Sequence, residues 1–148
     1  MKKANVPETL QLKYAMGCQQ GNMIYVGNMI DGKTILECTL NPHSNYVINR
    51  QLIMNLTAIV DRYIVMHIGG ERMKMSGMQY MKEVTISKGK DNTRIIVYRK
   101  NYRPLCYFWV YPCSNLMEQI LFESSIAVVI DAYVRSIKQS LKRQGWYK

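Results

Sequence analysis

The chain has 148 residues, of which 48% are hydrophobic and 20% charged, and it carries 20 Lys and Arg against 10 Asp and Glu. This composition is typical of one globular domain and excludes a disordered chain, and the length is sufficient to bury a core without disulfides or metals. The net charge of +10 favours phosphate-rich partners, although many basic proteins bind nothing specific.

The start of the chain carries two lysines but no apolar run behind them, and no stretch approaches the roughly 18 apolar residues of a membrane span. The four cysteines form no CxxC pair, so neither a zinc site nor a disulfide framework is indicated: Cys18, Cys38, Cys106 and Cys113. We therefore expect a protein of the cytoplasm, or of the host cytoplasm if the chain is viral. It would have mostly buried, reduced thiols, with no metal and no other cofactor.

Alternating and β-rich runs predict three strands in the first half, over 10–16, 23–30 and 33–40. Asp31-Gly32 lies between the last two, where an Asp-Gly pair predicts a hairpin with a type I′ turn. Pro42 ends the sheet, and Ser44 or Asn45 can cap a following helix through its side-chain oxygen. Apolar residues then recur every three to four positions and predict a helix from about 45 to 66, closed by Gly69-Gly70.

The same order of elements recurs in the second half. Strands are predicted over 82–88, 93–100 and 105–111. Pro112 breaks the last of them. Ser114 or Asn115 can cap a helix that would run to about residue 143, and Glu118, three residues after Asn115, suits a capping box.

The two halves align at an offset of 70 residues. Identical residues recur on both sides of the helix start and again inside the helix: Pro42, Ser44, Asn45, Asp61 and Tyr63 match Pro112, Ser114, Asn115, Asp131 and Tyr133. Convergence on similar caps would explain the first three matches, but it explains the later Asp-x-Tyr less easily. We therefore predict an α+β fold of tandem duplicated βββα units, with antiparallel sheets and two long helices packed on one side. The single domain 1–148 would hold repeats 9–66 and 79–143, joined by a connector over 67–78.

The segment from 88 to 111 combines many cations with many aromatic rings. Strand alternation places Arg94, Tyr98 and Lys100 on one face. If this is also the face of Tyr107 and Trp109, the rings could stack on bases while the cations hold phosphates. The candidate nucleic-acid-binding residues are Lys88, Lys90, Arg94, Tyr98, Lys100, Arg103, Tyr107, Trp109 and Tyr111. The alternative is that strands simply prefer aromatic residues, and that packing or another subunit covers the face.

Catalysis has little support in the sequence. His43 and His67 have no nucleophile or carboxylate at a recognisable spacing. The acids are scattered and the glycines form no phosphate-binding loop. We therefore expect no enzyme, no catalytic residues and no metal site.

The duplicated layout, the charge and the aromatic sheet resemble the Whirly and PUR families. The stretch from Tyr46 to Thr57 lies where a Whirly repeat has its first helix, and the ending Arg143-Gln-Gly-Trp146 is also similar to that family. The resemblance implies binding of single-stranded nucleic acid and formation of homo-oligomers. No functional residue is transferred from these families, because the similarity lies in the layout.

The best interpretation of the sequence is a non-catalytic protein that binds an anionic partner, single-stranded nucleic acid held on a basic and aromatic sheet face. One alternative is a phage-type sponge for small anionic nucleotide signals, or another anti-defence inhibitor. The other is a structural or assembly protein that uses the aromatic face as an interface.

Overall fold

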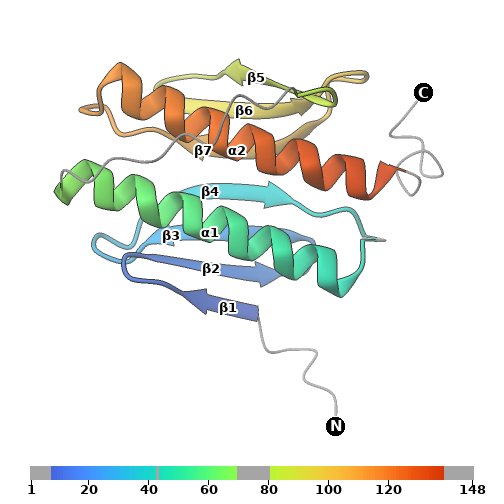
Figure 1. Cartoon of the computed structure of the whole chain (residues 1–148), viewed down its shortest axis with the longest axis horizontal. Coiled ribbons are helices and arrows are strands. Elements are labelled where there is room, and N and C mark those ends of the chain that lie inside the picture. The colour runs from blue at the N-terminus through green and yellow to red at the C-terminus, as the bar shows by residue number, and fades with distance from the viewer. Residues whose placement is uncertain (1–7, 43, 70–80, 139–148) are drawn as a thin grey trace, which may run out of the picture.

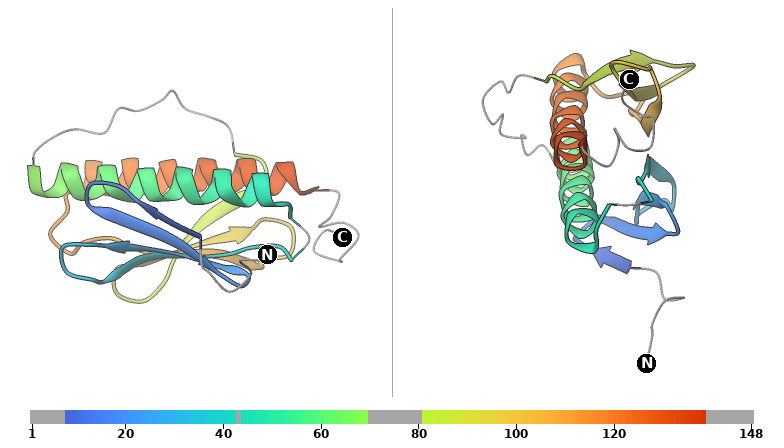
Figure 2. Two further views of the ribbon diagram at one scale, coloured as in Figure 1. Left: turned by 90° about the horizontal axis from the view of Figure 1, so that it is seen from below. Right: turned by 90° about the vertical axis from the view of Figure 1, so that its right-hand side faces the viewer.

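Seven strands of the described residues form one sheet, and two helices cover one of its faces (Figures 1 and 2). The structure is a computed structural model that describes residues 8–42, 44–69 and 81–138. The strands pair antiparallel in the order β1-β2-β3-β4-β7-β6-β5. In chain order the elements are β1 (Glu8–Gln11), β2 (Ala15–Gln20), β3 (Met23–Asn28), β4 (Thr34–Thr39), α1 (Tyr46–Gly69), β5 (Val84–Lys88), β6 (Thr93–Tyr98), β7 (Pro104–Trp109) and α2 (Leu116–Ser136). The predicted α+β class is confirmed.

The centre of the sheet is a pairing between the last strands of the two halves. In β4 and β7, Glu37 lies opposite Tyr107, and the flanking pairs are Leu36 with Phe108 and Cys38 with Cys106. Residues 37 and 107 are themselves separated by the offset of 70. This register therefore relates the two halves by an approximate two-fold axis that passes between Glu37 and Tyr107. The helices obey the same relation, since α1 and α2 run in opposite directions (Figure 1).

Equivalent hydrogen bonds recur in both halves. Asn45 and Asn115 each accept a bond from the backbone N–H three residues later, at 2.8 Å, and so cap α1 and α2 as predicted. Asp61 accepts bonds from the N–H groups of Tyr14 and Ala15, at 2.6 and 3.0 Å. Asp131 accepts the corresponding bond from Glu83, at 2.7 Å. The order of three strands and a helix is therefore common to β2–α1 and β5–α2, whereas β1 is an additional strand of the first half without a counterpart among the described residues of the second.

Two tyrosines exchange hydrogen bonds between the halves. The hydroxyl of Tyr63, on α1, accepts a bond from the N–H of Tyr111 at 2.9 Å. The hydroxyl of Tyr133, on α2, accepts one from the N–H of Asn41 at 2.9 Å. Each helix thus binds the backbone that leads into the other helix, and the two halves are joined at both ends.

The core lies between the helices and the sheet. The rings of Tyr63 and Phe122 stack at 3.8 Å between centroids, and Phe108 meets Phe122 edge-on at 5.4 Å. All three side chains are fully buried. They join the two helices to the middle of the sheet and make the domain one packing unit.

Helix α1 is long and apolar enough to cross a membrane by length and composition, contrary to the expectation that no stretch approaches this. Its packing explains its apolar character. Leu52, Leu56, Val60 and Ile64 are buried, and α1 contacts both β2 and α2. The helix runs to Gly69, so the first part of the predicted connector is helical. Residues 70–80 and 139–148 lie outside the described residues.

The predicted strand over 10–16 is not one continuous strand, because its ends belong to β1 and β2. The chain turns back there between β1 and β2, with a bond from the N–H of Leu12 to the carbonyl of Ala15 at 2.9 Å. The sequence hides β2 because Gly17 interrupts its alternation of side chains. A Cβ at Gly17 would lie 2.0 Å from Oγ1 of Thr57, so glycine at this position allows α1 to approach the strand.

The hairpin at Asp31-Gly32 is confirmed, but its turn is not type I′. Of the two residues only Gly32 has a positive φ, 72°, and the carboxylate of Asp31 accepts a bond from the N–H of Lys33 at 2.9 Å. The second half repeats this turn with Tyr102 in place of Gly32, at φ 54°. A bulky side chain with positive φ is unfavourable, so this turn is strained.

Candidate functional site

The face of the sheet opposite the helices is the first candidate surface. Its central row runs Tyr25, Glu37, Tyr107 and Ile95, which are directly opposite one another on neighbouring strands. Trp109 lies two residues along β7 from Tyr107. Both described helices lie on the other side of the sheet (Figure 2), and we call this set of side chains the outer face. Tyr107 is 37% exposed, and Tyr25 and Trp109 are half-buried.

Arg94 and Tyr98 do not share this face, so the single face assumed for the predicted site is wrong. Arg94 is opposite Phe108, and both point toward the helices. Its guanidinium binds the carboxylate of Glu123 on α2 at 2.7 Å, and its side chain is only 8% exposed. Tyr98 is fully buried. Lys88 lies opposite Arg94 in the pairing of β5 with β6, so its side chain leaves the backbone on the helix side of the sheet. It is exposed because β5 is an edge strand.

Tyr111 leaves the predicted row because β7 ends at Trp109. Its ring turns toward the helices and stacks on Tyr63, at 5.1 Å between centroids. Its hydroxyl accepts a bond from the amide of Asn28 at 2.8 Å. Burial raises the pKa of the Tyr111 hydroxyl, and the bond from Asn28 opposes that shift. The alternation rule fails here because Pro112 begins the turn into α2.

The remaining predicted cations lie in turns at opposite ends of the strands. Lys90 is exposed in the turn between β5 and β6. Lys100 and Arg103 are exposed in the turn between β6 and β7. Of the nine predicted residues, the structure therefore brings two to the outer face and three to its two ends.

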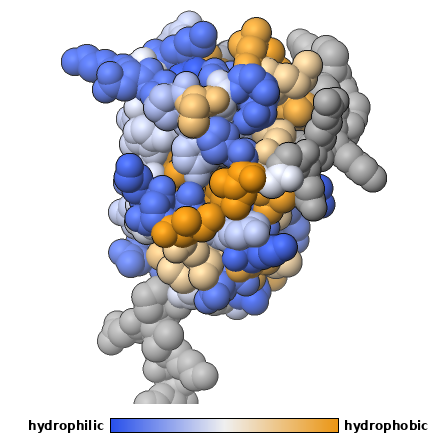
Figure 3. All heavy atoms as spheres, turned by 90° about the vertical axis from the view of Figure 1, so that its left-hand side faces the viewer, coloured by the Kyte–Doolittle hydropathy of each residue, from blue (hydrophilic) through white to orange (hydrophobic). Residues whose placement is uncertain are grey.

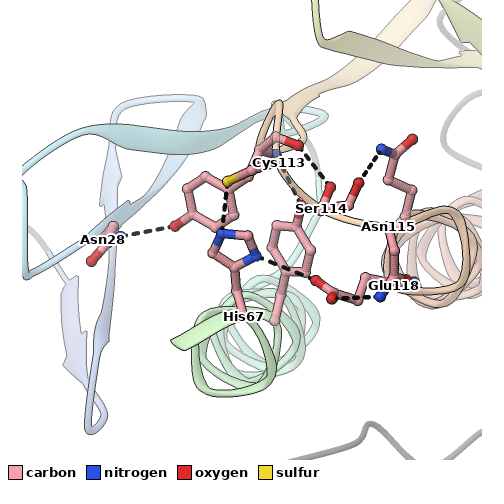
Figure 4. A network of polar contacts seen from close by, with 9 residues as sticks. Asn28, His67, Cys113, Ser114, Asn115 and Glu118 are labelled. Carbon is pink, nitrogen blue, oxygen red and sulfur yellow. Dashed lines mark hydrogen bonds and ion pairs between the residues drawn. The ribbon is translucent and has the colours of Figure 1, made fainter. Parts of the chain in front are cut away.

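A second candidate site lies where α1 ends and α2 begins (Figure 4). Nε2 of His67 is 3.2 Å from Sγ of Cys113, and its Nδ1 is 3.3 Å from Oε2 of Glu118. We call these three residues the thiol cluster. Cys113 is exposed, whereas the side chains of His67 and Glu118 are 20% and 18% exposed.

The thiol cluster is held in place by its neighbours. The amide of Asn115 donates to Oε1 of Glu118 at 2.9 Å, and the N–H of Glu118 donates back to Asn115 at 2.8 Å. The imidazole of His67 stacks on the ring of Tyr111, at 4.6 Å between centroids. These contacts fix both the carboxylate and the imidazole before any ligand arrives.

The arrangement is a linear chain of groups, not a cage for a metal. The two nitrogens of one imidazole point in opposite directions, so the sulfur and the carboxylate of the thiol cluster cannot bind one ion together with it. Among the residues that the structure describes, no group of three His, Cys, Asp or Glu side chains could hold a metal ion.

The expectation of no catalytic residues rested on the lack of a nucleophile or carboxylate at a recognisable sequence spacing from either histidine. In the folded chain, however, a thiol and a carboxylate both lie beside the imidazole of His67. The sequence gives no signal, because Cys113 and Glu118 are 46 and 51 residues away along the chain. The prediction that both helices pack on one side of the sheet did not specify which helix ends meet.

The other thiols are less accessible. Cys38 and Cys106 are buried, as expected, and Cys18 is half-buried. Burial raises the pKa of the Cys106 thiol well above its ordinary value, and the adjacent Cys38 adds to this shift. Cys113 is therefore the one exposed thiol among the described residues.

Comparisons with protein-family models, curated proteins and solved structures find no match to this chain.

Proposed function

We propose that the protein binds single-stranded nucleic acid across the outer face. The observation that carries this proposal is the alternation along β7. Phe108 points into the core, while Tyr107 and Trp109 point to the side of the sheet away from the two described helices. An antiparallel sheet with aromatic rings at the centre of such a face offers flat surfaces on which bases stack. Each stacked base contributes about 1–3 kcal/mol.

The surroundings of the rings suit bases better than phosphates. Tyr107 lies between Glu37 and Ile95, and Tyr25 lies on the other side of Glu37. Glu37 would repel a phosphate but can accept a hydrogen bond from a base. The bases are therefore expected over the middle of the outer face, with the backbone of the nucleic acid toward its ends.

Cations stand at those ends. Lys90 lies at one end of β6, and Lys100 and Arg103 lie beyond the other end. Six residues of strand separate the two turns, which corresponds to about 20 Å. The net charge of +10 adds a long-range attraction to any phosphate backbone.

Fluorescence anisotropy with labelled single-stranded DNA, single-stranded RNA and duplex DNA, at two or more salt concentrations, tests the proposal. Trp109→Ala should weaken binding of single strands by about 1–3 kcal/mol and leave the salt dependence unchanged, because stacking releases no ions. Lys90→Ala should weaken binding and reduce the slope of log K against log salt by about 0.7, the value for one phosphate of a single strand.

Matched controls come from the opposite layer. Tyr46 and Arg62 are exposed on α1, on the helix side of the molecule. Tyr46→Ala and Arg62→Ala should each bind as the unchanged protein does. A thermal melt of every variant separates a loss of binding from a loss of folding.

Full folding of Trp109→Ala with unchanged affinity for all three nucleic acids would exclude the outer face as the binding site. If no nucleic acid binds and light scattering shows a dimer that Tyr107→Ala dissociates, the outer face is an assembly interface instead. Glu37→Gln provides an independent check. It removes a negative charge from the outer face and should raise the affinity for single strands.

A further inference from the structure

The order of contacts in the thiol cluster assigns a role to each of its members. A carboxylate only accepts hydrogen bonds, so Nδ1 of His67 carries the proton that points at Glu118. Nε2 then presents its lone pair to Sγ of Cys113 at 3.2 Å. The nucleophile thus contacts the base, and the base contacts a group that orients it. This is the arrangement used in nucleophilic catalysis by a thiol.

The internal repeat shows that the fold does not require this chemistry. At the opposite end, Ser44 forms the same turn as Ser114 does here. The hydroxyl of Tyr133 contacts Ser44 and accepts a bond from a backbone N–H there, as the hydroxyl of Tyr63 accepts one here. Yet the positions equivalent to His67 and Glu118 are the apolar residues 137 and 48, both isoleucine. The imidazole and the carboxylate are therefore additions to a framework that forms without them.

We propose that Cys113 is the nucleophile of an acyl-transfer site, with His67 as its base and Glu118 as the positioning residue. Sγ attacks the carbonyl carbon of an ester or thioester while His67 takes the thiol proton, and the electrons of the C=O bond move to the oxygen. As the intermediate collapses, the bond to the leaving group breaks and His67 protonates the departing oxygen or sulfur. The product is an acyl group on Cys113, which water then releases as a carboxylic acid with His67 again as base.

Two further features of this end favour such a reaction. Cys113 lies three residues before Leu116, the first residue of α2, and the partial positive charge of a helix N-terminus stabilises an oxyanion nearby. Exposed apolar side chains surround the start of α2: Leu116, Met117 and Ile120, with Ile68 at the end of α1. Figure 3 views the molecule from this end and shows apolar side chains set among polar ones. These residues suit a substrate with an apolar acyl chain.

The full chain is tested with p-nitrophenyl butyrate. We expect a burst of one nitrophenolate per chain, and peptide mapping by mass spectrometry should find the butyryl group on Cys113. Cys113→Ala should abolish the burst, and Cys18→Ser should leave it unchanged. His67→Gln should slow acylation by about 10²–10⁴-fold, the usual contribution of a general base.

Circular dichroism and urea unfolding verify that each variant folds. If His67→Gln does not fold, Glu118→Gln replaces it in the test, because glutamine keeps the cap partner of Asn115 and loses only the charge. We then expect acylation to slow with the profile of rate against pH displaced. The proposal is overturned if Cys113 is acylated no faster than Cys18, or if the folded variant that is tested acylates at the rate of the unchanged protein. Neither result depends on whether the outer face binds nucleic acid.

Discussion

Replacement of Gly17 by alanine tests the close approach of α1 to β2. The added Cβ would lie 2.0 Å from Oγ1 of Thr57, where real Cβ contacts stay above 3.0 Å, so the helix or the side chain must move by 1 Å or more. Gly17 does not have a positive φ, so the backbone accepts alanine without strain and the main penalty comes from packing. Overpacking of this kind costs about 1–3 kcal/mol.

Two smaller effects accompany the clash. The hydroxyl of Thr57 donates to the carbonyl of Ile53 at 2.6 Å, and rotating it away forfeits about 1 kcal/mol. Alanine in place of glycine restricts the unfolded chain, which returns about 0.4–1 kcal/mol. We therefore expect Gly17→Ala to lower the free energy of unfolding by about 1–3 kcal/mol.

A double-mutant cycle isolates the contact. In a Thr57→Ala background the clashing oxygen is gone and the nearest atom is the Cβ of residue 57, at 3.3 Å, so Gly17→Ala should be nearly neutral. The second repeat has the corresponding combination: Ile86 is the strand residue equivalent to Gly17, and Ala127 is the helix residue equivalent to Thr57. The coupling energy should be about 1–3 kcal/mol.

Urea unfolding followed by circular dichroism measures the midpoint at constant m-value. Gly69→Ala is the matched control, because nothing lies within 4 Å of a Cβ added there. The reasoning is refuted if Gly17→Ala is as stable as the unchanged protein, or if it loses as much stability in the Thr57→Ala background.

Three further predictions concern stability. Arg94→Met leaves the carboxylate of Glu123 without its ion-pair partner, and because that side chain is 17% exposed we expect a loss of about 2–3 kcal/mol by urea unfolding; a folded variant with a changed salt slope of nucleic-acid binding would contradict this assignment. Tyr102→Gly removes a left-handed side chain, so the protein should gain about 0.5–1 kcal/mol, and a lower melting temperature would disprove the strain. Burial raises the pKa of four groups in the folded state: Tyr63, Tyr111, Tyr133 and Cys106. The free energy of unfolding should therefore be highest below their unfolded pKa values and fall as pH rises through about 9 to 11. A free energy of unfolding that stays constant over this window would contradict the burial of these groups in the neutral form.

The two helices could be predicted because their signals lie in residues that are close together in the sequence. The caps at Asn45 and Asn115 and the apolar stripes of both helices need only neighbouring residues, and all are present. Strand β2 was missed because Gly17 is required by a close contact with Thr57 on α1, which is 40 residues away in the chain. No local pattern records such a contact.

The candidate site depended on which face of the sheet each strand residue occupies. For residues of different strands, this is set by how the strands pair. The candidate site required Arg94 to share a face with Tyr107, which alternation within each strand cannot decide, and the register sets Arg94 opposite Phe108 instead. A shift of one residue moves a side chain to the other face. The thiol cluster was out of reach for a related reason: its members meet only because α1 ends beside the start of α2 (Figure 4).

The exchanged tyrosine hydroxyls give the two halves the character of a fused homodimer. In a pair of separate identical chains, the bond from a helix tyrosine to the partner's backbone would be made twice, once in each direction. Here Tyr63 and Tyr133 make it within one polypeptide. Joining the halves in one chain frees each copy to change alone, and this freedom allows an imidazole and a carboxylate at one end while the other end keeps isoleucine at both positions. A single half, expressed alone, would present an open strand edge at β4 or β7 and an unpaired helix, and it should associate with a second copy of itself.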